Sequence, residues 1–170
     1  HLKLDVDSLN RDALAKEAKK LGVEIEKTMS KGHIVDAIYK KAIRPKLWDP
    51  QFVIHHPSEM FPLAKARKED PSKAESIQLL VGGGWELVKA YTEQNDPAVQ
   101  KKAFEEQESL FRKGLEDAQR MDEDFVEALE YGMPPTAGMG MGVDRLVALL
   151  TNSHSLREVI LFPTMKPKND

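Results

Sequence analysis

The stretch that decides the fold is "GMGMGVDRLVALLTN", residues 138–152, where glycine alternates with methionine and an apolar helical pattern follows at once. Residues two apart share a face in a strand, so the glycines would line one side of a sheet and the apolar residues the other. The glycines are Gly138, Gly140 and Gly142, and the apolar residues are Met139, Met141 and Val143. A row of glycines weakens a strand, so it indicates that another molecule approaches the backbone closely.

Arg145 stands in the first turn of the helix that we expect from about Asp144 to Leu150. The N–H groups at a helix start favour an anion, and a guanidinium can stack on a base or pair with phosphate. The glycine strand and Arg145 together therefore describe a shelf for a nucleotide. The alternative is a glycine-rich strand packed on a helix, with Arg145 in a surface ion pair with Asp144 or Glu158. The spacing alone leaves both interpretations open.

The composition is that of a globular protein. Of the 170 residues, 41% are hydrophobic and 31% charged, and the formal net charge is -3, which gives no overall attraction to nucleic acid or membrane. No apolar run approaches the roughly 18 residues of a membrane span. The absence of cysteine excludes disulfides and thiolate metal sites and fits a reducing compartment, so we expect a cytoplasmic protein without membrane attachment. The chain starts at His1, without methionine or signal peptide, so we expect a fragment or a processed product.

Residues 1–47 form a basic segment with the pattern of two short helices. The segment holds 11 lysines and arginines against 7 acidic residues. Apolar residues recur at helical spacing in both halves, Gly22 is well placed to end the first helix, and Pro45 closes the second. We expect a small helical segment over 1–47, followed by a main unit over 48–170.

The main unit mixes strands and helices. The predicted strands are 51–57, 76–84, 85–94, 138–143 and 158–163, and the glycines at 82–84 would join the second to the third. Between the first two strands, residues 61–75 are polar and broken by proline, as in a loop. The predicted helices begin at Asn95 or Asp96, at Asp122 or Asp124, and near Asp144. Because the elements do not alternate as βαβ units, the predicted fold class is α+β, an antiparallel β-sheet flanked by helices.

The segment "WELVKAYTEQNDP", residues 85–97, is an acidic strand. On a regular strand Lys89, Tyr91 and Glu93 share a face and Glu86 points the other way, so a bulge would be needed to bring Glu86 into the same pocket. Carboxylates can hold Mg²⁺ on ATP or receive an ammonium group. The alternative is a solvated strand face with a cross-strand ion pair. Two histidines, His55 and His56, are adjacent on a strand and would point to opposite faces, which favours a structural role over a metal site.

Residues 138–163, "GMGMGVDRLVALLTNSHSLREVILFP", closely resemble the third signature motif of class II aminoacyl-tRNA synthetases. Residues 123–167 look like the carboxyl end of the lysyl-tRNA synthetase family in particular. The likeness extends upstream through "HHPSEMFPLAKA" and "GGGWELVKAYTEQNDP" and covers residues 52–167.

The resemblance implies roles for individual residues. Arg145 matches the catalytic arginine that stacks on the adenine of ATP, and Gly140 and Gly142 border the ligands. Glu86 matches a carboxylate that binds the Mg²⁺ carried by ATP. Tyr91 and Glu93 match positions in the pocket for lysine, and Gly140 borders that substrate too.

Two positions depart from the family pattern. The family usually has asparagine where this chain has Lys89, next to the bound amino acid; Lys89 could meet a substrate carboxylate or pair with Glu93. The family also commonly has a second magnesium-binding glutamate about seven residues before Glu86, and this chain offers Gln78 or Leu79 there. Gln78 is neutral and would hold magnesium more weakly.

The implied function is the activation of lysine with ATP and Mg²⁺ and its transfer to tRNA(Lys), by an enzyme that is a homodimer at full length. Sequences like the first and second motifs of the class are not found, so the chain looks like the carboxyl-terminal half of the catalytic domain, inactive alone, with 1–47 as a helical insertion. One alternative is a paralogue that lysylates a protein. The other is a nucleic-acid-binding module centred on residues 9–42, whose binding would depend steeply on salt.

Overall fold

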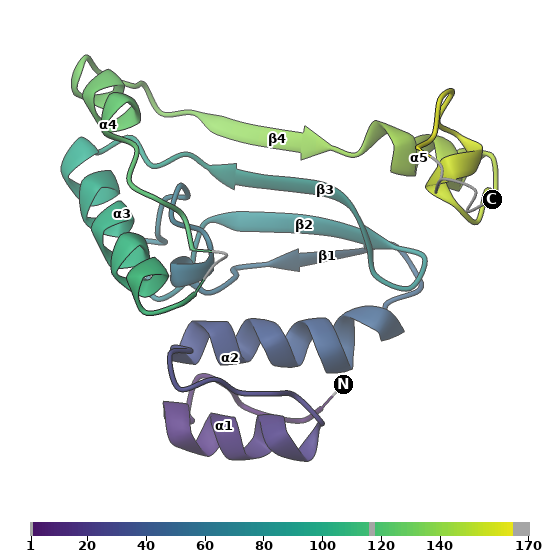
Figure 1. Cartoon of the computed structure of the whole chain (residues 1–170), viewed down its shortest axis with the longest axis horizontal. Helices are drawn as coiled ribbons and strands as arrows, with labels where there is room; N and C mark the ends of the chain where they lie inside the picture. Colours follow the sequence, from purple (N-terminus) through teal and green to yellow (C-terminus); the bar gives the residue numbers. More distant parts are fainter. Residues whose placement is uncertain (1, 116–117, 165–170) are drawn as a thin grey trace, which may run out of the picture.

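The computed structural model describes residues 2–115 and 118–164, and its centre is a four-stranded antiparallel sheet. The strands follow the chain in the order β1-β2-β3-β4 (Figure 1). They are β1 (Gln51–Ile54), β2 (Ser76–Val81), β3 (Trp85–Thr92) and β4 (Ala137–Met141). The predicted α+β class with an antiparallel sheet is confirmed.

Five α-helices lie around the sheet in the described part of the chain. They are α1 (Arg11–Lys20), α2 (Lys31–Ile38), α3 (Pro97–Arg112), α4 (Glu123–Glu130) and α5 (Val143–Leu150). In Figure 1, α3 and α4 lie together at one end of the strands, α5 follows β4 at the opposite end, and α1 and α2 lie beyond β1. No helix in the described residues combines the length and the apolar character that crossing a bilayer requires.

Short polar side chains begin the helices as the sequence predicts. Of the two candidates for each cap, Asp96 begins α3 and accepts the N–H groups of Ala98 and Val99, and Asp122 begins α4. Each side chain satisfies backbone donors that the first helical turn leaves without a partner.

The helical segment 1–47 contains its own small core. Leu14, Ala18 and Ile34 are fully buried there, and only residues up to Ile38 pack into this cluster. After α2 the helical path continues through a π-turn, η1 (Tyr39–Ile43), and a 3₁₀ turn, η2 (Arg44–Lys46), and it ends just past Pro45.

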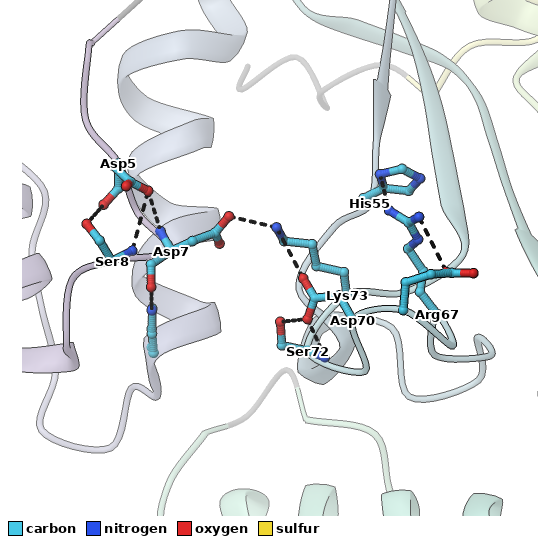
Figure 2. Close-up of polar contacts among 10 residues, drawn as sticks. Asp5, Asp7, Ser8, His55, Arg67, Asp70, Ser72 and Lys73 are labelled. Atoms are coloured by element: carbon cyan, nitrogen blue, oxygen red, sulfur yellow. Dashed lines mark hydrogen bonds and ion pairs between the residues drawn. The ribbon is translucent and has the colours of Figure 1, made fainter.

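Polar contacts at both ends attach this segment to the rest of the chain. Arg44 Nε donates to the carbonyl oxygen of Gly84 at 2.8 Å, in the turn between β2 and β3. At the other end, Lys73 Nζ lies 2.7 Å from Asp7 Oδ2 and 3.3 Å from Asp70 Oδ2 (Figure 2). Lys73 therefore joins the residues before α1 to the loop before β2.

The sequence prediction was wrong for residues 158–163, which do not form a strand. Residues 156–158 form a 3₁₀ turn, η4 (Leu156–Glu158), and Leu161 and Phe162 are 89% and 91% exposed. A strand needs a neighbour to receive its hydrogen bonds, and α5 carries the chain away from β4 (Figure 1). Residues 158–163 therefore have the apolar pattern of a strand, but no described strand pairs with them. Val143 was also expected to end the glycine strand, and it instead begins α5.

Candidate active site

A bulge in β3 brings Glu86 to the face that carries Lys89. Gln78 pairs with Lys89 and Leu80 pairs with Glu86, and the register shifts between Leu79 and Leu80. Since Gln78 and Leu80 share a face of β2, their partners share it too. The bulge that the sequence required for a common pocket is present, with Leu87 as the extra residue.

Gly138 and Gly140 lie on this same face. They pair with Tyr91 and Lys89 across β3 and β4, while Met139 and Met141 face the other way. A Cβ atom added at Gly140 would meet nothing closer than the carbonyl oxygen of Lys89 at 3.9 Å. The sheet surface over Gly140 is therefore open to another molecule.

Glu93 borders that open surface. A Cβ atom at Gly138 would overlap its Oε1 atom, so the glycine gives the carboxylate its place beside β4. Burial raises the pKa of Glu93 above its ordinary value, and the pKa of Tyr91 is raised first by burial and then by the negative charge of Glu93. A partly buried carboxylate is stabilised by a cation, which suits it to an ammonium group.

Arg145 turns toward Glu86 from the first turn of α5. Its Nη1 atom donates to the carbonyl oxygen of Glu86, and its side chain packs over Gly142, where an added Cβ would lie 3.3 Å from Arg145 Cδ. Within the described residues, no ion pair joins Arg145 to Asp144 or Glu158. The surface ion pair considered from the sequence is therefore not the arrangement found.

Lys89 and Tyr91 line a cavity of about 520 Å³ beside the glycine surface. Lys89 Nζ lies 4.3 Å from the centroid of the Phe61 ring, and the Tyr91 ring meets Phe61 edge-on with centroids 6.2 Å apart. Asp36 and Glu59 also line the cavity. The described ion pairs include none of Glu86, Lys89 or Glu93, so neither a Lys89–Glu93 pair nor a cross-strand ion pair of these residues is formed. Phe61 was not predicted as a site residue, although it lies in the quoted stretch "HHPSEMFPLAKA".

Gln78 contacts the carboxylate of Glu86 through its side-chain amide N–H group. Its Nε2 group donates to Glu86 Oε2 at 2.8 Å, and its Oε1 atom receives the Tyr39 hydroxyl at 3.3 Å and lies 3.0 Å from His56 Nε2. His56 is only 6% exposed, and its other ring nitrogen lies 2.9 Å from Ser76 Oγ. A structural histidine was expected here from the sequence, but neither His56 nor Tyr39 was predicted to contact the site residues.

The side chains of the site fit a magnesium ion that is bound together with the phosphates of a nucleotide. No group of three or more carboxylate, histidine or cysteine side chains in the described residues could hold a metal by itself. Mg²⁺ usually keeps several waters and binds to one or two carboxylates together with substrate phosphates. Glu86 supplies one such carboxylate, and Arg145 donates to the backbone carbonyl of the same residue.

A helix and a bulged strand thus place an arginine, a carboxylate and an open glycine surface side by side, as in a nucleotide-dependent ligase site. The family described as tRNA synthetases class II (D, K and N) matches residues 6–166. The chain belongs to this family. Because the match begins at residue 6, it includes the helical segment.

Lysine–tRNA ligases of several bacteria are similar to this chain. The chain is 46% identical over 168 residues to the lysine–tRNA ligase of Porphyromonas gingivalis, covering 99% of this chain and 29% of that protein. It is 45% identical over 165 residues to that of Azobacteroides pseudotrichonymphae, covering 97% and 33%, and 47% identical over 153 residues to that of Carboxydothermus hydrogenoformans, covering 90% and 31%. The chain spans about a third of the length of these relatives.

Proposed function

We propose that the chain is part of an enzyme that activates lysine with ATP and transfers it to tRNA(Lys). The observation that carries this proposal is the contact of Arg145 with the backbone carbonyl of Glu86, next to the open surface over Gly140. Lysine–tRNA ligases named among the relatives support the choice of amino acid and of acceptor. They favour the tRNA enzyme over a paralogue that lysylates a protein.

Each described residue has a role in this reaction. The open surface over Gly140 receives the nucleotide, and Arg145, which packs over Gly142, stacks on adenine near the phosphates. Glu86 holds the Mg²⁺ that accompanies ATP; the ion, when bound, neutralises phosphate charge. Glu93, Tyr91 and Lys89 surround the amino acid, with Glu93 facing its ammonium group.

The chemistry requires positioning rather than a protein nucleophile. The carboxylate of lysine attacks the α-phosphate of ATP, and pyrophosphate leaves. A ribose hydroxyl at the 3′ end of tRNA then attacks the carbonyl carbon of the lysyl-adenylate, takes the lysyl group and releases AMP. The chain's residues orient these groups and balance their charge. The homodimer, the cytoplasmic location and the inactivity of this chain alone stay predictions.

The structure argues against treating residues 9–42 as a separate nucleic-acid-binding module. The family match includes them, and Tyr39 of the following turn reaches Gln78 beside Glu86. The segment is thus connected to the site.

The direct test is a titration of the ¹⁵N-labelled chain with ATP and Mg²⁺, followed by NMR. We expect shifts at Gly140, Gly142 and Arg145, and loss of binding in Arg145→Ala. Arg157→Ala is the matched control, because Arg157 is an exposed arginine in η4 that should not touch the nucleotide. Unchanged spectra, or equal loss in both variants, would contradict the proposal. Lysine-dependent pyrophosphate exchange by the chain alone should stay at background.

A further inference from the structure

A chain of hydrogen bonds runs from β1 to Glu86. The backbone N–H of His56 donates to Ser76 Oγ at 3.3 Å, and Ser76 Oγ lies 2.9 Å from His56 Nδ1. The opposite ring nitrogen lies 3.0 Å from Gln78 Oε1, and Gln78 Nε2 lies 2.8 Å from Glu86 Oε2. The chain is continuous, so the orientation of each group depends on the next.

Only one proton assignment satisfies the whole chain when Glu86 is ionised. Ser76 donates its hydroxyl proton to Nδ1 of His56, so Nε2 carries the ring proton and donates to the Gln78 oxygen. The reverse assignment would turn that oxygen toward Glu86 Oε2, 2.8 Å away, where two acceptors repel each other. Burial lowers the pKa of His56 and so favours the neutral ring, which this assignment needs.

The oxygen of Gln78 is fully used in this arrangement. It receives the His56 ring N–H and the Tyr39 hydroxyl, which occupy both of its lone pairs. Gln78 is also only 8% exposed. A cation could take this oxygen only by displacing both donors.

We propose that Gln78 is a positioning residue, which fixes the carboxylate of Glu86 so that Oε1 faces the metal–phosphate group, while His56 and Tyr39 fix Gln78. This inference rests on the proposed function, and it replaces the direct metal role that the sequence suggested for Gln78. The carboxylate of Glu86, held by the neutral amide of Gln78, is then the single protein carboxylate that binds the metal at this position. Tyr39 lies in η1, so the helical segment contributes to the metal-binding geometry.

The test measures how much of the affinity for ATP depends on the metal. ATP is titrated into the chain once with Mn²⁺ and once with EDTA, and the ratio of the two affinities is compared between variants. Gln78→Met keeps the length of the side chain and removes its donor, and should lower the ratio about tenfold, the lower end for residues that hold a metal ligand. The affinity in EDTA should stay unchanged in Gln78→Met.

Gln100→Met is the matched control, because Gln100 is a fully buried glutamine that donates to the carbonyl oxygen of Pro62. It should leave the ratio unchanged even if it destabilises the fold. A second readout needs no ligand: the ¹⁵N shifts of the His56 ring should show the proton on Nε2, and Ser76→Ala should weaken that preference.

The outcomes are distinguishable. If the unaltered chain binds no ATP under either condition, the proposed function fails and this inference fails with it. If ATP binds but the ratio is the same in Gln78→Met and the unaltered chain, only the positioning role is overturned. A proton found on Nδ1 of His56 would also overturn it, whatever ATP does.

Discussion

The variant Gly140→Ala tests whether the surface over Gly140 binds a ligand or is needed for the stability of the fold. The backbone at Gly140 does not have the positive φ values that favour glycine, and an added Cβ would have only one neighbour within 4 Å, at 3.9 Å. Glycine in a strand costs roughly 0.5–1 kcal/mol relative to alanine. The variant should therefore be more stable by about that amount, which corresponds to about 1–4 °C in Tm for a chain of this size.

The same methyl group should weaken nucleotide binding. It would stand on the surface that the nucleotide is proposed to contact, and overpacking a close contact costs about 1–3 kcal/mol. ATP affinity should accordingly fall by roughly 5- to 150-fold. The stability and the affinity are thus expected to change in opposite directions.

The assay combines urea unfolding with an ATP titration of the same preparations. Met139→Ala is the control, because Met139 lies on the opposite face of β4 and is 68% exposed; it should leave the affinity unchanged. If Gly140→Ala binds ATP as tightly as the unaltered chain, the nucleotide does not contact this surface. If the variant is less stable, the space over Gly140 is not open.

Four further predictions concern the fold and its ionisation. Gly84→Ala should lower the free energy of unfolding by about 2 kcal/mol or more, because φ at Gly84 is +94° and the added Cβ would lie 2.5 Å from a backbone oxygen. Gly22→Ala is the control for the backbone angle alone: φ there is +73° and the space is free, so urea unfolding should show a cost of only about 1 kcal/mol. Because burial raises the pKa of Glu93, its contribution to stability is full below the unfolded pKa and is lost as the pH rises through the folded pKa. Glu93→Gln should therefore reduce the loss of stability as the pH rises above the unfolded pKa, and equal slopes of stability against pH in the two proteins would contradict this. Lys73→Ala should cost less than about 1 kcal/mol, and the cost should shrink in high salt, because its partners are exposed (Figure 2). Deleting residues 1–47 should broaden the thermal unfolding transition or lower its midpoint, and a remainder of unchanged stability would show that the segment does not support the sheet.

The sequence determined the local elements of this protein well. Short polar caps, the glycines at 82–84 and the alternation of 138–141 depend on neighbours a few residues away, so the helices, the β2–β3 turn and the two faces of β4 followed from pattern alone. The need for a bulge before Glu86 could enter the site was also evident, since strand periodicity fixes which residues share a face. The strand expected at 158–163 was wrong because an apolar pattern does not supply a pairing partner.

The tertiary structure alone decided how the site residues meet. The bulge opposite Leu80, the ring of Phe61 under Lys89 and the hydrogen bonds that turn Gln78 toward Glu86 all join residues from different elements. Their geometry depends on register and packing, which no local pattern encodes. Residue types can thus name the chemistry of a site in advance, but the direction in which an amide or a carboxylate points is set by partners that only folding brings together.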